Sequence, residues 1–115
     1  MSEPVPVTIS YRNIEPSESI EDAVRSHATR LEKFCSSLIS TRVLLETPHR
    51  RGQKGQHHHV RIEMAVPGND LIVSHDPGDV EAHEDLSVAT RDAFRAARRE
   101  LEDYSQKRRH QVKRH

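Results

Sequence analysis

The side chains best suited to chemistry in this sequence are arginines set at helical spacing towards the C-terminus. Arg91, Arg95 and Arg98 recur at intervals of four and three residues, and Arg99 flanks them. We expect this row to lie opposite the apolar stripe of its helix, where each guanidinium offers a fork of donors that suits a phosphate group. The row indicates contact with a phosphate backbone, although a solvated helix face with local ion pairs produces the same pattern.

Further basic side chains could extend such a contact. They occur on a predicted N-terminal helix, on a glycine-containing loop and in the C-terminal tail: Arg25, Arg30 and Lys33; Arg50, Arg51 and Lys54; and Lys107, Arg108, Arg109, Lys113 and Arg114. Basic clusters bind a polyanion by releasing its counterions, but they are also ordinary solvated surface. The segment Gly52-Gln-Lys-Gly55 matches the GxxG loop of KH domains, which joins two helices. Here the segment lies between predicted strands, so we reject the KH interpretation and expect only a flexible basic loop.

Nine histidines raise the alternative of a metal site. Those that could converge are His49, His57, His58, His59, His75 and His83. Neighbouring strand residues point to opposite faces, so the triplet supplies two convergent ligands at best, and zinc needs three or four protein ligands. We expect no bound metal and no cofactor. His27 falls within an apolar helical stripe and is predicted to be a packed boundary residue.

A catalytic constellation is not evident. His83-Glu84-Asp85 could be drawn as an acid/base group, but it precedes a helix, where capping and the helix dipole explain both carboxylates. The sequence has no glycine-rich phosphate loop and no nucleophile elbow. We therefore expect that the protein is not an enzyme.

Hydrophobic periodicity predicts the elements that position these side chains. Alternation predicts strands over residues 5–12, 39–46, 58–66 and 71–75, and three- and four-residue spacing predicts helices over 18–35 and about 85–106. Ser17 is a suitable N-cap for the first helix, whose stripe continues through either Phe34 or Cys35. The order β-α-β-β-β-α predicts an α+β fold in which two helices pack on one face of a four-stranded sheet. The other face should carry Arg12, Arg42 and Arg61.

Composition sets the remaining bounds. The 115 residues suit one domain, which we place at 1–109, followed by a flexible basic tail at 110–115. A lone cysteine, no apolar leader and no long apolar run favour a soluble cytoplasmic protein. The net charge is zero, but the charges are segregated. Residues 86–115 carry nine basic and four acidic side chains, residues 34–66 five and two, and residues 67–85 none and six.

Two helical segments in this order carry a resemblance. Tyr11-Arg-Asn-Ile-Glu-Pro-Ser-Glu-Ser-Ile20 opens a helix ending Arg30-Leu-Glu-Lys-Phe34, and His83-Glu-Asp-Leu-Ser-Val-Ala-Thr-Arg-Asp-Ala-Phe-Arg-Ala-Ala-Arg-Arg-Glu-Leu101 opens the last helix. Over about residues 7–109 the chain resembles the ribosome hibernation-promoting factor/protein Y family, in its short form without a dimerisation domain. The resemblance implies a protein that binds the small ribosomal subunit and its ribosomal RNA over the decoding sites under stress, and blocks messenger and transfer RNA there.

This resemblance makes candidates for RNA contact of the arginine row with Arg99, the basic side chains of the N-terminal helix and of the glycine-containing loop, and the tail residues Lys107, Arg108 and Arg109. We expect no membrane partner, no DNA partner and a monomer away from the ribosome. Two alternatives stay open: a histidine-based metal-binding stress protein, and an interaction adaptor whose acidic loop 76–85 docks a basic partner.

Overall fold

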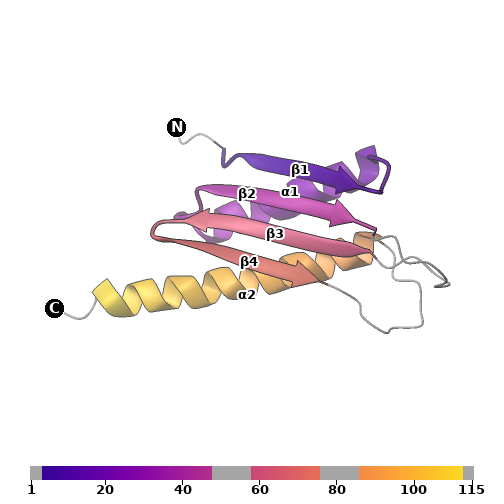
Figure 1. Ribbon diagram of the computed structural model, residues 1–115. Helices are drawn as coiled ribbons and strands as arrows, with labels where there is room; N and C mark the ends of the chain where they lie inside the picture. Colours follow the sequence, from indigo (N-terminus) through magenta and orange to yellow (C-terminus); the bar gives the residue numbers. More distant parts are fainter. Residues whose placement is uncertain (1–3, 48–57, 76–85, 113–115) are drawn as a thin grey trace.

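The computed structural model describes residues 4–47, 58–75 and 86–112. The elements are β1 (Val7–Arg12), α1 (Glu18–Phe34), β2 (Ser40–Glu46), β3 (His59–Val66), β4 (Asn69–His75) and α2 (Leu86–Val112). Figure 1 shows the four strands side by side as one sheet, with both helices behind it. The predicted α+β class and the order β-α-β-β-β-α are therefore confirmed.

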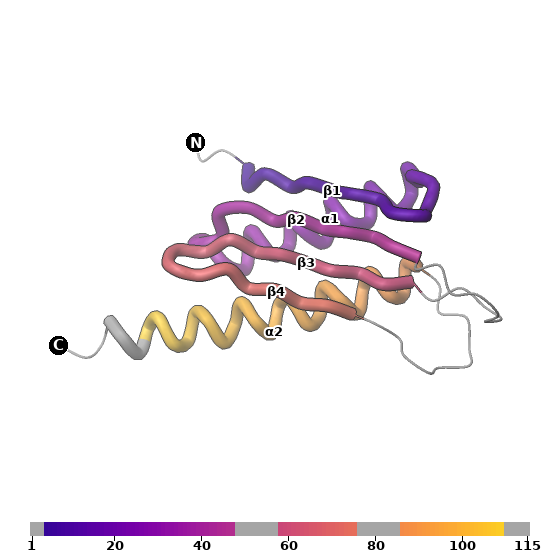
Figure 2. Tube along the Cα trace, in the orientation of Figure 1, coloured from indigo at the N-terminus to yellow at the C-terminus, as the bar shows by residue number. Residues whose placement is uncertain are grey.

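The strands are ordered β1-β2-β3-β4 across the sheet. β1 and β2 are parallel because α1 carries the chain back between them, whereas β2, β3 and β4 are antiparallel neighbours. The chain trace in Figure 2 shows the tight connection between β3 and β4. Here Pro67 fixes its own φ and Gly68 has a φ of +79°, the combination that a type II turn requires.

Alternating burial along the strands gives the sheet one covered face and one open face. In β3 the residues Val60, Ile62, Met64 and Val66 are buried and those between them are not. The buried side chains of α1 and α2 complete the same core; they include Val24, Ala28 and Leu31 from α1, and Ala93, Ala97 and Leu101 from α2. The helices therefore pack on one face, as predicted.

The first helix begins where the sequence predicts. The Ser17 hydroxyl accepts a hydrogen bond from the backbone N–H of Ile20 at 3.4 Å, which satisfies one of the donors that a helix start leaves free. Glu18 and Glu21 stand in the first turn, where carboxylates favour the positive helix end. Ile39, with which the predicted second strand begins, instead precedes β2 and is 54% exposed.

The last helix is longer than predicted. α2 continues to Val112, beyond the predicted end near residue 106. Contacts to other elements hold this part of the helix. The Tyr104 hydroxyl donates to the Pro67 carbonyl at 3.0 Å, and Arg108 donates to the Ser37 hydroxyl at 3.2 Å. None of the helices, as far as the structure describes them, has the length and apolar character needed to span a membrane.

Candidate nucleic-acid interface

An open groove of about 460 Å³ runs between α1 and α2, and within the described part of the chain these two helices supply its walls. We call it the inter-helix groove. It is lined by His27, Arg30, Leu31 and Phe34 from α1, and by Arg91, Phe94, Arg95 and Arg98 from α2. Each helix contributes positions i, i+3, i+4 and i+7, which lie along one side of a helix. The sequence spacing thus positions two matching rows of side chains.

Apolar and aromatic groups form the floor of this groove. Leu31 and Phe94 are buried, and the His27 ring stacks on Phe94 with 5.1 Å between centroids and 17° between planes. Burial, reinforced by the positive charges of Arg30 and Arg91, lowers the pKa of His27. His27 is therefore a neutral, packed residue at pH 7, which confirms its predicted role as a boundary histidine.

Four arginines form the walls of the groove. Arg91 and Arg95 share a single carboxylate, because Asp92 Oδ1 lies 3.5 Å from Arg91 Nε and 3.9 Å from Arg95 Nη1. The Arg98 guanidinium lies over the Phe34 ring, 4.9 Å from its centroid, a cation–π contact that leaves its charge uncompensated. Within the described residues, one acidic side chain thus faces four permanent cations, and the groove is positive.

The sequence predicts that the row Arg91, Arg95 and Arg98 lies opposite the buried stripe of α2. This prediction is wrong. The row flanks that stripe on the side of α1. The reason is Phe94, which belongs to the buried stripe and draws this side of the helix towards α1. The correction matters because it brings the row together with Arg30 across the groove.

Arg12, Arg42 and Arg61 lie on the open face of the sheet, as predicted, but carboxylates compensate them there. Arg12 pairs with Glu46 across β1 and β2 at 3.2 Å. Arg42 and Arg61 both pair with Glu63, at 3.9 and 3.4 Å. The open face is therefore less attractive to a polyanion than the helix side.

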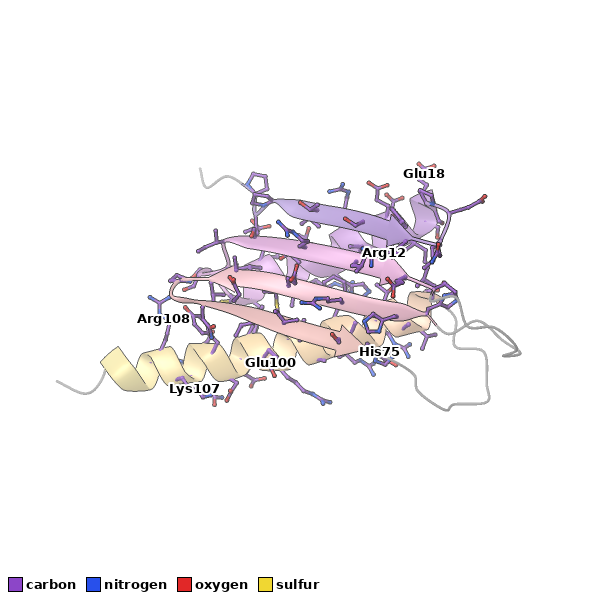
Figure 3. All side chains as sticks on the ribbon, viewed as in Figure 1. Arg12, Glu18, His75, Glu100, Lys107 and Arg108 are labelled. Atoms are coloured by element: carbon purple, nitrogen blue, oxygen red, sulfur yellow. The ribbon has the colours of Figure 1, made fainter. Side chains whose placement is uncertain are left out.

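The remaining candidates are scattered. Arg25 pairs with Glu21, and Lys107 pairs with Asp103, each at 3.1 Å. Lys33 and Arg99 are exposed and do not line the inter-helix groove. Arg50, Arg51 and Lys54 lie outside the described residues, as do Lys113 and Arg114. Lys107 and Arg108 project from the C-terminal part of α2 (Figure 3).

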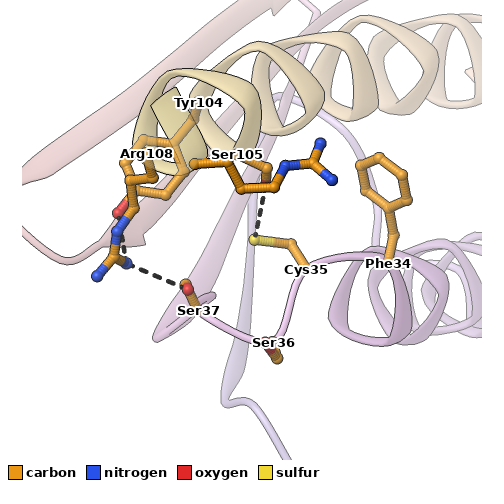
Figure 4. Close-up of a pocket in the computed structure, with 8 residues that line it drawn as sticks. Phe34, Cys35, Ser36, Ser37, Tyr104, Ser105 and Arg108 are labelled. Carbon is orange, nitrogen blue, oxygen red and sulfur yellow. Dashed lines mark hydrogen bonds between the residues drawn. The ribbon is translucent and has the colours of Figure 1, made fainter. Parts of the chain in front are cut away.

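A second hollow of about 430 Å³ adjoins the groove. It is lined by Phe34, Cys35, Ser36, Ser37, Tyr104, Ser105, Arg108 and Arg109. Figure 4 shows Phe34 on one side of it and Tyr104 with Arg108 on the other. Phe34 belongs to both hollows and is 39% exposed, whereas Cys35 is buried. This settles which of the two adjacent residues continues the α1 stripe: Cys35 enters the core, and Phe34 faces the groove.

The histidine hypothesis gains no support from the described residues. No group of three or more histidine, cysteine, aspartate or glutamate side chains in them could hold a metal ion. His58 lies with its Nδ1 3.0 Å from the Thr47 hydroxyl, and His59 is on the open sheet face. His49, His57 and His83, and the acidic loop 76–85 of the adaptor alternative, lie outside the described residues.

The fold and the groove together define a small α+β protein whose helix layer suits a polyanionic partner. Comparison with known proteins specifies the class further. Residues 7–109 match the family described as sigma 54 modulation protein / S30EA ribosomal protein. The chain belongs to this ribosome-associated family, the hibernation-promoting factor family that its sequence resembles.

Solved structures show the same fold. The N-terminal domain of Protein Y from Thermus thermophilus is similar with a TM-score of 0.64 and 20% identity, over 84% of this chain and 94% of that one. A ribosomal subunit interface protein from Coxiella burnetii is similar with a TM-score of 0.66 and 8% identity, over 88% of this chain and 98% of that one. Among curated proteins no match was found.

Proposed function

We propose that this protein binds the ribosomal RNA of the small subunit over the decoding region, in the cytoplasm and under stress, and thereby silences the ribosome. The observation that carries the proposal is the inter-helix groove, which four arginines of the described residues line, two of them sharing the carboxylate of Asp92. Membership of a ribosome-associated family supplies the partner. The two named structural neighbours, a Protein Y domain and a ribosomal subunit interface protein, agree with it.

The groove suits an RNA backbone for physical reasons. Arg91 and Arg98 are seven residues apart, a rise of about 10 Å along a helix, so the row can reach several phosphates of one strand. Arg30 approaches from the opposite wall, which lets the groove hold a backbone from two sides. Double-stranded RNA is recognised mostly by shape and by sugar and phosphate contacts, which arginine forks provide. Zero net charge is no obstacle, because local charge decides.

Silencing follows from the location proposed. A rigid domain held over the decoding sites occupies space that messenger and transfer RNA need, so binding is competitive and no chemical step is required. The protein would then act as a reversible competitive inhibitor. Competing RNA would displace it, and a rise in ionic strength would weaken its phosphate contacts.

Co-sedimentation with isolated ribosomal subunits tests the proposal. We expect the protein to pellet with small subunits at low salt, to remain in solution with large subunits, and to be displaced by messenger and transfer RNA. Replacing Arg91, Arg95 and Arg98 by glutamine should abolish pelleting. The matched control replaces Arg12, Arg42 and Arg61, which removes the same charge from the open face and should leave pelleting intact.

Two outcomes would contradict the proposal in different ways. Preferential binding to large subunits, or binding unaffected by messenger RNA, would place the protein away from the decoding region. Equal pelleting of the two triple variants would remove the inter-helix groove from the contact.

A further inference from the structure

We propose that the second hollow receives one unpaired nucleotide of the bound RNA, whose base stacks on Phe34 and whose phosphate contacts Arg109. The inference rests on the proposed function, because it assigns a specific part of the RNA to a site that adjoins the inter-helix groove. It adds a selectivity that the arginines alone do not give, namely a preference for looped over fully paired RNA.

Phe34 is an aromatic ring kept at the surface. It is 39% exposed in a chain that has only four Phe and Tyr residues and no tryptophan. The Arg98 guanidinium covers one face of the ring, and Phe34 also lines the second hollow, from which a flat partner could reach the ring. Unpaired bases stack on such rings regardless of their identity, because every base has a π-face.

The hollow has the dimensions and lining of a nucleotide site. Its volume of about 430 Å³ lies in the range of about 300–1,000 Å³ that is usual for ligand pockets. The Ser36, Ser37 and Ser105 side chains line it, and hydroxyls both donate and accept, so they can satisfy base edges of either kind.

The wall opposite Phe34 is held in place before any ligand arrives. Arg108 Nη1 donates to the Ser37 hydroxyl at 3.2 Å and to the Tyr104 hydroxyl at 3.1 Å, and its guanidinium lies 5.7 Å from the centroid of the Tyr104 ring. The Cys35 thiol lies 3.7 Å from the Ser105 hydroxyl. A preformed slot loses little entropy on binding, and Figure 4 shows these contacts.

Charge and continuity favour a nucleotide over an apolar ligand. Arg109 lines the hollow and is exposed, so its guanidinium can contact a phosphate. Phe34 also lines the inter-helix groove, so a backbone that follows the arginines passes directly beside the hollow. A fully paired duplex cannot supply the base, because its bases are stacked on one another. A loop, bulge or strand end can.

Binding of two short RNAs of equal charge, one a stem with a single-stranded loop and the other fully paired, tests the inference. Phe34→Leu keeps an apolar side chain but removes the stacking surface, and should weaken binding of the looped RNA by about five- to a hundred-fold. Affinity for the paired RNA should stay unchanged. Phe34→Trp should retain full affinity, and because the chain has no tryptophan, quenching of its fluorescence by the looped RNA reports stacking directly.

A matched pair of arginine variants tests the phosphate contact. Arg109→Gln should weaken looped RNA more than Arg99→Gln, which removes the same charge from a position on α2 that lines neither hollow. Melting temperatures of all four variants verify folding.

The outcomes separate this inference from the proposed function. If the parent protein binds RNA in a salt-sensitive manner but Phe34→Leu loses no affinity for the looped RNA, the inference is wrong and the proposed function stands. If the parent binds neither RNA nor small subunits, the proposed function fails first. Quenching of Phe34→Trp by an acidic peptide of equal charge, and not by looped RNA, would overturn the inference in favour of a protein ligand.

Discussion

Salt dependence provides the sharpest quantitative test of the inter-helix groove. Each phosphate that a cation neutralises adds about 0.9 to the slope of log affinity against log salt on duplex DNA, and about 0.7 on single strands. If Arg91, Arg95 and Arg98 each contact phosphate, replacing all three by glutamine should reduce the slope by about 2–3. Asp92, now without its two arginine partners, would add repulsion on top of this loss.

For the control variant, in which the arginines of the open sheet face are replaced, we expect almost no change in the salt slope. Arg12, Arg42 and Arg61 are compensated by Glu46 and Glu63, so few counterions are released from a polyanion there. Their replacement by glutamine should change the slope by much less than one. The two triple variants have equal net charge, and a difference between them therefore reports position.

The groove variant should still fold, with only a modest loss of stability. The side chains of Arg91 and Arg95 are 51% and 68% exposed, and exposed ion pairs contribute about 0–1 kcal/mol each. A loss of that size shifts the melting temperature by up to about 6 °C per pair in a domain of this length. Binding isotherms on small subunits at four or five salt concentrations give the slopes. Equal slopes for the two triple variants would refute the reasoning, because the groove would then hold no phosphates.

Three further predictions concern stability. Because burial lowers the pKa of His27 below its ordinary 6.5, the unfolded chain binds this proton more tightly, and stability falls as pH drops below about 6.5. In denaturant titrations at several pH values, His27→Gln should remove that part of the decline. An unchanged pH profile of the variant would contradict this prediction. Leu101→Ala, at a fully buried position, should cost about 2–5 kcal/mol, whereas Glu102→Ala on the exposed side should cost under about 0.5 kcal/mol. Gly68→Ala should cost about 1–2 kcal/mol through its positive φ alone, since nothing lies within 4 Å of the added Cβ; a thermal melt showing no loss would exclude this.

Sequence periodicity predicted the architecture because each element here buries a single face. The alternation of Val7, Ile9 and Tyr11 predicted the inward face of β1, and these residues pack against the core. The N-cap at Ser17 followed from local chemistry alone. Such features depend on residues within one turn or one strand, and a single sequence shows them.

Features that depend on contacts between elements were not predictable. The arginine row was predicted to lie opposite the apolar stripe of the last helix, but Phe94 belongs to the buried side, so the rotation of α2 about its axis was misjudged. Its length was underestimated because the contacts that hold its end, from Tyr104 to Pro67 and from Arg108 to Ser37, join residues far apart in the chain. Phe34 and Cys35 could not be separated, since adjacent helical positions lie only about 100° apart.

The register of the sheet decides which side of this electrically neutral molecule would attract the RNA that we propose it binds. In the observed register Arg42 lies opposite Glu63, and Leu44 lies opposite Arg61. A slip of two residues between β2 and β3 would keep the same side chains on the open face but place Arg42 opposite Arg61 or Ala65. Like charges would then adjoin or stand unpaired, and the open face would compete with the inter-helix groove for phosphate. Because the carboxylates are paired on the sheet side, the excess positive charge is left between the helices, beside the second hollow that we propose selects for an unpaired base.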